Sequence, residues 1–159
     1  MYLLIDDIKN NVINYGIPKK FIKNKYSSTE YSLIRYGLLI FYNITDFDIE
    51  YLESGKPFFK NLDINISISH DNNLVCVLLS SKRIGVDLQF FYPVSNKLKK
   101  FLNIPIFYDS IDSVIEFSKR EAFIKLFNLS INNINNLNLS LCKYKLYLFN
   151  DYVVVCAFL

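Results

Sequence analysis

The chain has 159 residues, of which 52% are hydrophobic and 16% aromatic, so it is too apolar for a disordered protein and long enough for one domain with a buried core. Its formal net charge of +3 is small, and overall charge gives no reason to expect nucleic-acid binding. No apolar run is long enough to span a bilayer, and the first residues lack the basic start of a signal peptide. The three cysteines lack metal-ligand spacing and lie in apolar runs, which is typical of buried thiols in a reducing compartment. We therefore expect a cytoplasmic protein that binds neither nucleic acid nor membrane.

The N-terminal part of the sequence predicts a strand, a basic segment and a helix. Residues 2–5 form an apolar run typical of a strand, and residues 18–26 are rich in lysine with aromatic residues between. Residues 27–44 carry apolar side chains at helical spacing, and we expect Ser28 to cap the start of this helix.

The middle of the chain predicts a turn followed by strands. Gly55 permits unusual backbone angles and Pro57 forces the residue before it to be extended, so residues 53–59 are expected to turn. Alternating or continuous apolar runs then predict strands at 64–70, 73–81 and 84–91.

The C-terminal part predicts the strongest helix and a hairpin. Residues 111–128 place apolar side chains at helical spacing. Residues 137–159 are typical of two strands joined at Asn150-Asp151, a good two-residue turn. The order strand, helix, strands occurs twice, which indicates an α+β fold of two similar αβ halves with antiparallel sheets packed on helices. We expect one domain, 1–159, with halves of about 1–82 and 83–159.

Two pairs of polar residues have a spacing that suits chemistry. Asp87 and Gln89 leave the same face of a strand and could supply two oxygen ligands to Mg²⁺, although such a pair alone is more often a solvated sheet face. Glu121 and Lys125 are neighbours on one helix face and could hold a metal and a phosphate oxygen, although an ordinary helical ion pair has the same spacing.

Three other features also have ordinary explanations when each is taken alone. His70, the only histidine, ends an alternating strand. The lysines between residues 19 and 25 have the pattern of a solvated charge run, and Gly55-Lys56-Pro57 is a turn.

The order of these segments nevertheless resembles the 4′-phosphopantetheinyl transferases, in the larger single-chain surfactin-type branch. That family has a G-K-P turn, an N-I-S-H strand end, a G-[IV]-D-[IL]-E strand and a W-x-x-K-E-[AS]-x-x-K helix. This chain has GKPFF at 55–59, NISISH at 65–70, IGVDLQ at 84–89 and FSKREAFIK at 117–125. The resemblance covers residues 55–125, and the terminal hairpin ending in VVVCAFL is similar as well.

The resemblance implies a short variant of the transferase fold and a Mg²⁺-dependent enzyme. Such enzymes move the phosphopantetheine arm of coenzyme A to a serine of an apo acyl, peptidyl or polyketide carrier protein, and release adenosine 3′,5′-bisphosphate. The partners would be coenzyme A and the carrier protein, and we expect a monomer. The alternative is a module that keeps the fold and binds coenzyme A or a carrier protein without turnover.

The motifs also imply roles for individual residues. Asp87 and Glu121 would be carboxylate ligands of the cation, with Gln89 standing where the family usually has a third acid. Lys125 would contact the diphosphate and stabilise the leaving group, and Glu121 would accept the serine proton directly or through water. We expect Asp87, Glu121 and Lys125 to be catalytic.

The same motifs imply the contacts to coenzyme A. Ser69 and His70 would meet a phosphate, and Lys125 would contribute to binding as well. The adenine pocket would be lined by Gly55, Lys56 and Pro57. The 3′-phosphate would be met by the basic stretch with Lys19, Lys20 and Lys23.

Three positions depart from the family pattern. Gln89 replaces an acid, Phe117 stands where tryptophan is usual, and Arg120 stands where the helix motif has lysine. Because Gln89 is neutral, the sequence predicts that Gln89→Glu is tolerated or raises the affinity for Mg²⁺.

Overall fold

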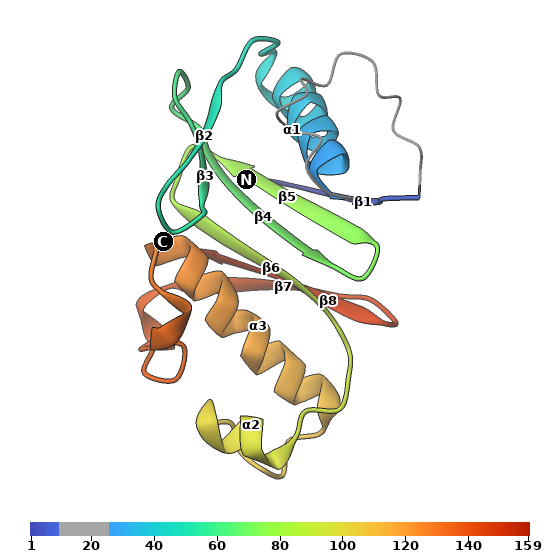
Figure 1. The fold of residues 1–159 in the computed structure, drawn as a ribbon, viewed down its shortest axis with the longest axis vertical. Coiled ribbons are helices and arrows are strands. Elements are labelled where there is room, and N and C mark those ends of the chain that lie inside the picture. The colour runs from blue at the N-terminus through green and yellow to red at the C-terminus, as the bar shows by residue number, and fades with distance from the viewer. Residues whose placement is uncertain (10–25) are drawn as a thin grey trace.

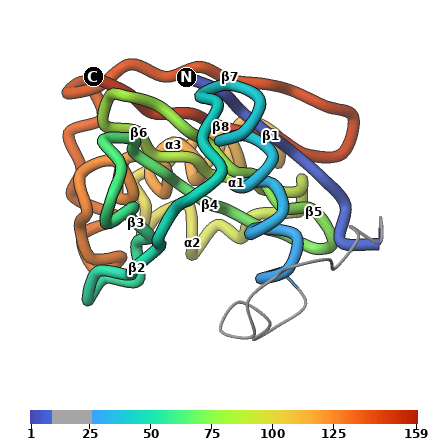
Figure 2. Tube along the Cα trace, turned by 90° about the horizontal axis from the view of Figure 1, so that it is seen from above, coloured from blue at the N-terminus to red at the C-terminus, as the bar shows by residue number. Residues whose placement is uncertain are grey.

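The computed structural model describes residues 1–9 and 26–159, which form a mixed α+β fold with antiparallel sheets (Figure 1). Within these residues, no helix combines the length and the apolar character needed to cross a membrane. Seen from above, both chain ends lie on the same side of the molecule (Figure 2).

The first half of the chain forms a sheet covered by one helix. Its elements are β1 (Tyr2–Asp7), α1 (Ser27–Tyr42), β2 (Ile49–Tyr51), β3 (Pro57–Phe59), β4 (Asn65–Asp71) and β5 (Leu74–Ser80). The main sheet has the order β1-β5-β4, with both pairs antiparallel, and β2 and β3 form a separate small hairpin.

The second half repeats this strand order. Its elements are β6 (Ile84–Phe90), α2 (Asn96–Phe101), α3 (Ser110–Phe127), two short 3₁₀ helices (Ile131–Asn133 and Leu139–Leu141), β7 (Lys143–Leu148) and β8 (Tyr152–Phe158). The sheet has the order β6-β8-β7, again fully antiparallel. In both sheets the first strand pairs with the last, and the last pairs with the one before it, so the two halves share a topology.

The two sheets lie between the two long helices, as Figure 1 shows. Alternate residues of each strand explain this layering, because successive side chains of a strand point to opposite faces. In β8, Val153 and Val155 pack against α3, whereas Val154 and Cys156 join Cys76 of β5 in an apolar layer between the sheets. A third cluster joins α1 to the outer face of the first sheet.

Several local expectations need correction. The helix α1 begins at Ser27 with Tyr26 at its N-cap position and no side-chain cap bond, so Ser28 does not cap it. Leu139–Leu141 is a 3₁₀ turn, so the expected C-terminal strand starts only at Lys143. The turn at Asn150-Asp151 is confirmed, and its closing bond runs from the backbone N–H of Phe149 to the carbonyl of Tyr152 at 3.0 Å.

Two elements were not expected. The turn at residues 53–59 is the end of a hairpin, since β3 pairs with β2. The short helix α2 begins after Ser95, whose side chain accepts a bond from the backbone N–H of Leu98.

Candidate functional site

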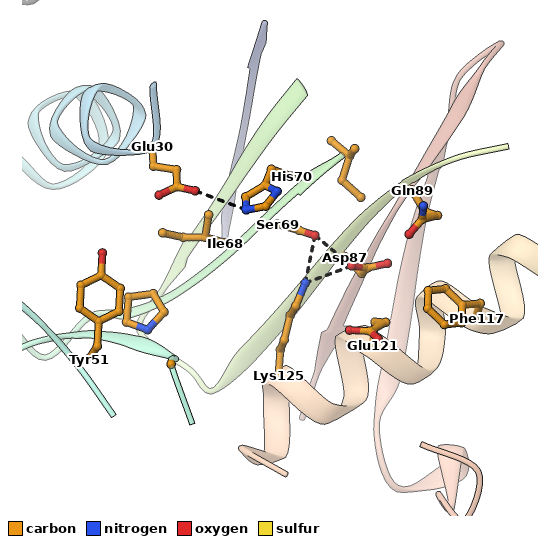
Figure 3. Close-up of a pocket in the computed structure, with 13 residues that line it drawn as sticks. Glu30, Tyr51, Ile68, Ser69, His70, Asp87, Gln89, Phe117, Glu121 and Lys125 are labelled. Carbon is orange, nitrogen blue, oxygen red and sulfur yellow. Dashed lines mark hydrogen bonds and ion pairs between the residues drawn. The ribbon is translucent and has the colours of Figure 1, made fainter. Parts of the chain in front are cut away.

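A cleft of about 460 Å³ lies where β4, β6 and α3 meet (Figure 3). Both halves of the chain contribute to its wall. The lining residues are Glu30, Tyr51, Gly55, Pro57, Ile68, Ser69, His70, Asp87, Leu88, Gln89, Phe117, Glu121 and Lys125.

The floor of the cleft is a polar seam between β4 and β6. These strands belong to different sheets and are joined by side chains instead of a backbone ladder. Ser67 Oγ accepts a bond from the backbone N–H of Val86 at 3.0 Å, and Ser69 Oγ donates to Asp87 Oδ1 at 2.9 Å. The alternation of isoleucine and serine in β4 explains the seam, because Ile66 and Ile68 turn to the α1 side and the serines face β6.

Helix α3 approaches β6 closely because the strand has a glycine at the contact. A Cβ atom on Gly85 would lie 2.0 Å from the carbonyl oxygen of Ala122 and 2.5 Å from the backbone nitrogen of Leu126. Asp87 is two residues further along the same strand face, and Glu121 and Lys125 lie on the neighbouring face of the helix. The close packing of α3 on β6 therefore brings the side chains of Asp87, Glu121 and Lys125 into the same cleft.

Asp87 and Lys125 form a largely buried ion pair. The Lys125 Nζ donates to Asp87 Oδ1 at 3.0 Å and to Ser69 Oγ at 2.9 Å. The Asp87 side chain is only 6% exposed, whereas that of Lys125 is 27% exposed. The second carboxylate oxygen, Oδ2, is buried without a hydrogen-bond partner among the described residues. A buried carboxylate oxygen left unpaired is costly, so this atom is a strong candidate ligand for a cation.

Glu121 lies on α3 beside this ion pair and lines the cleft. Burial raises its pKa above the ordinary value, the negative charge of Asp87 raises it further, and Lys125 partly offsets both effects. A divalent cation would relieve the unfavourable effect of the Asp87 charge on the ionisation of Glu121.

Gln89 also lines the cleft, and its amide nitrogen donates to Asp71 Oδ2 at 2.8 Å. Because the amide oxygen lies opposite that nitrogen, it is turned away from Asp71, toward the side of Asp87 and Glu121 (Figure 3). The described residues contain no group of three or more His, Cys, Asp or Glu side chains with metal-binding geometry. The residues that could hold a cation are two carboxylates, Asp87 and Glu121, and the Gln89 amide oxygen, a set that suits Mg²⁺ completed by water and phosphate.

The other end of the cleft is aromatic and surrounds His70. The imidazole stacks on the ring of Tyr26, with centroids 3.9 Å apart and planes 3° apart. Its Nε2 lies 4.0 Å from Glu30 Oε1, and burial raises the pKa of Glu30. Tyr51 also lines the cleft, together with Pro57, its partner in the β2–β3 hairpin, and the two rings offer apolar surfaces.

Of the three turn residues expected to line the adenine pocket, two line the cleft and one does not. Gly55, which has φ 82°, and Pro57 line the cleft. Lys56 does not line it, because its Nζ donates to the carbonyl oxygen of Lys125 at 2.7 Å and so binds the C-terminal end of α3. Burial, together with the nearby charge of Arg83, lowers the pKa of Lys56.

The structure thus brings together eight of the residues singled out in the sequence. They are Gly55, Pro57, Ser69, His70, Asp87, Gln89, Glu121 and Lys125. Lys56 lies outside the lining, and Lys19, Lys20 and Lys23 lie outside the described residues.

Sequence reasoning did not find Glu30, Tyr51 or Asp71. Glu30 and Tyr51 carry no local signal, since each is one polar or aromatic residue in an ordinary helix or strand. Asp71 did carry one, because it continues the strand face of Ser67 and Ser69.

Comparisons with known proteins do not identify the chain: no protein-family model and no curated protein matches it. The function must be inferred from the geometry of the cleft.

Proposed function

We propose that the protein is a 4′-phosphopantetheinyl transferase that modifies a serine of an apo carrier protein with the arm of coenzyme A. One observation carries this proposal: Asp87 of β6 shares one cleft with Glu121 and Lys125 of α3, more than thirty residues further along the chain, and with a histidine and a polar seam. The residue types suit a diphosphate with a cation, because they combine hard oxygen ligands with a positive side chain.

The reaction would form a bond between the serine oxygen and the phosphorus next to the pantetheine arm. The bond from that phosphorus to the bridging diphosphate oxygen would break, and adenosine 3′,5′-bisphosphate would leave with the electron pair. A Mg²⁺ ion bound by Asp87, Glu121 and the Gln89 amide oxygen would act as a Lewis acid on the diphosphate. Lys125 can exchange its bond to Ser69 for one to a phosphate oxygen and so stabilise charge on the leaving group.

Glu121 would accept the proton from the serine. A carboxylate at this position can take the proton directly or through water. Glu121 lines the cleft with Asp87, which supports a role for it as the base beside a bound phosphate.

The aromatic end would hold the nucleotide part of coenzyme A. His70, kept in place by the Tyr26 ring and by Glu30, would donate to a phosphate. The adenine would lie against Tyr51 and Pro57, beside Gly55. In the same proposal, Lys19, Lys20 and Lys23 would meet the 3′-phosphate.

The test is to incubate the protein with apo carrier proteins of several classes, coenzyme A and Mg²⁺, and to follow the carrier by intact-protein mass spectrometry. We expect the carrier to gain the mass of phosphopantetheine only when Mg²⁺ is present. Glu121→Ala should lose transfer far more than coenzyme A binding, and Lys119→Met, on the same helix but outside the cleft, should keep both. Coenzyme A binding without any mass gain would support the non-catalytic module, and near-normal turnover by Glu121→Ala would refute the role of Glu121.

A further inference from the structure

The contacts between β4 and β6 follow a repeat. Ser67 Oγ accepts from the backbone N–H of Val86, and four residues later Asp71 Oδ2 accepts from the backbone N–H of Phe90 at 2.8 Å. Residue numbers rise together on both strands, so the strands run parallel and hold one register over this length. A residue at position 71 therefore meets β6 just as residue 67 does.

The hydrogen bonds between side chains follow the same register, but the donor and the acceptor exchange strands from one step to the next. At one step of the seam a hydroxyl on β4, Ser69, donates to a carboxylate on β6, Asp87. One step further the carboxylate is on β4, as Asp71, and it accepts from the amide of Gln89 on β6. The acid and its donor have exchanged strands.

The Asp71 carboxylate is held firmly enough to orient its neighbour. Its Oδ2 accepts from the Gln89 amide and from the backbone N–H of Phe90, and its Oδ1 accepts from the backbone N–H of Asn72 at 2.8 Å. An amide that donates to a fixed acceptor has its oxygen fixed on the opposite side. Here that side is the one on which Asp87 and Glu121 lie (Figure 3).

We propose that Asp71 is a positioning residue that holds the Gln89 amide oxygen toward the cation site, and that these two residues form a matched pair. While residue 71 is an aspartate, residue 89 must be a neutral donor. This inference rests on the proposed function for the role of the cation, whereas the pairing itself concerns the protein without any ligand.

The sequence alone predicts that Gln89→Glu is tolerated or raises the affinity for Mg²⁺, whereas the matched pair predicts that the substitution costs stability in the wild-type background. A glutamate at position 89 would lose the bond at 2.8 Å and would set two carboxylates against each other across the seam. The same substitution should be harmless beside a serine at position 71. That hydroxyl can accept from the backbone N–H of Phe90, as Ser67 does from Val86, and donate to the introduced carboxylate in the same way that Ser69 donates to Asp87.

The test is a double-mutant cycle of wild type, Asp71→Ser, Gln89→Glu and the double variant that carries both substitutions. Asp63→Ser is a control that removes an exposed carboxylate outside the seam. Thermal unfolding without metal at low salt reports the pairing. The side-chain amide signals of Gln89 in NMR spectra report its orientation, and Mn²⁺ binding followed by electron paramagnetic resonance reports the cation site.

We expect Gln89→Glu to lower the melting temperature when made in wild type and to leave it nearly unchanged when made in Asp71→Ser. In wild type, the two side-chain amide protons of Gln89 should give one pair of signals with distinct chemical shifts, because one proton is hydrogen-bonded to Asp71. In Asp71→Ser, their chemical shifts should move toward the values of a free, mobile side-chain amide. Gln89→Glu should strengthen Mn²⁺ binding at least about threefold more in the Asp71→Ser background than in wild type, a coupling within the usual range for contacting residues.

Equal effects of Gln89→Glu on melting in both backgrounds would overturn the matched pair. The expected difference in melting temperature between the two backgrounds, together with no Mn²⁺ binding by any variant, would contradict the cation site. That result would overturn both the positioning role and the proposed function. Coupling in melting together with Mn²⁺ binding that is equal in wild type and Asp71→Ser would overturn the positioning role alone and leave the proposed function standing.

Discussion

The two halves of the molecule share a strand order but differ in how the helix meets the sheet. In the first half the contact glycine is Gly37 on helix α1, and a Cβ there would approach only the methyl ends of Leu4 and Leu79, at 2.7 and 2.8 Å. In the second half the glycine is Gly85 on the strand, and the helix backbone itself occupies the space at 2.0 Å. Helix α3 is therefore pressed against its sheet in a way that α1 is not.

This difference explains where the chemistry lies. The short carboxylates of Asp87 and Glu121 influence each other only because the strand and helix that carry them are in close contact. The first half, whose helix packs through leucine side chains, contributes Ser69 to the floor of the cleft and His70 and Glu30 to its aromatic end. One half thus provides the charged centre and the other provides the surrounding contacts.

The largest effect should come from adding a side chain at Gly85, with Gly37 as the comparison. We expect Gly85→Ala to reduce the free energy of unfolding by at least about 3 kcal/mol, because backbone atoms cannot move aside. Gly37→Ala should cost less than about 1 kcal/mol, since leucine side chains can shift and alanine favours the helix. Urea unfolding of both variants measures this, and equal losses would contradict the comparison.

The next effect concerns the buried charge. Lys125→Met should cost about 2 kcal/mol of stability at neutral pH, because Asp87 is left buried without its partner. Lys119→Met is the matched control: Lys119 is equally exposed at 27%, but its partner Glu116 is 23% exposed. That variant should cost about 0.5 kcal/mol. Unfolding curves that gave both variants the same loss would argue against a special environment for Asp87.

A smaller effect should follow from the contact that joins the two halves at the end of α3. Lys56→Met removes a cation from the carbonyl oxygen of Lys125, and we expect a loss of about 1 kcal/mol. Helix α1 serves as the reference, because it ends at Tyr42 without a basic residue in its last turn. Amide hydrogen exchange should therefore rise at the end of α3 and stay constant in α1; a uniform change across both helices would contradict a local role.

The finest difference is between two glutamates whose pKa values are both raised. Burial alone raises the pKa of Glu30, whereas Asp87 adds to the effect at Glu121. A raised pKa in the folded protein means that ionisation opposes folding, so Glu121→Gln should gain stability over wild type as the pH rises from about 4 to 7. Mg²⁺ should remove this gain and lower the pKa of Glu121 but not of Glu30. Carboxyl NMR titrations with and without Mg²⁺ test this, and an equal response of both groups would contradict it.

The parts of the fold that could be predicted are those with a repeating local pattern. The serine and isoleucine alternation of β4 and the apolar spacing of α3 show their elements directly in the sequence. The β2–β3 hairpin and α2 are too short to have a recognisable period. The pairing of Asp71 with Gln89 depends on the register between strands of two different sheets, which no local pattern reveals.

The candidate site was predictable to a similar extent. The order of the motifs predicted that Asp87, Glu121 and Lys125 would lie close together. The structure confirms this proximity, since all three line one cleft. Motif order could not show that Lys56 would turn to the end of α3, because that contact depends on the helix end lying beside the turn.

The most direct measurement is anomalous diffraction from crystals grown with coenzyme A and Mn²⁺. We expect one manganese peak within bonding distance of Asp87 Oδ2, of the Glu121 carboxylate and of a diphosphate oxygen. Coenzyme A bound in the cleft with manganese absent from that position, or manganese bound to neither carboxylate, would contradict the account.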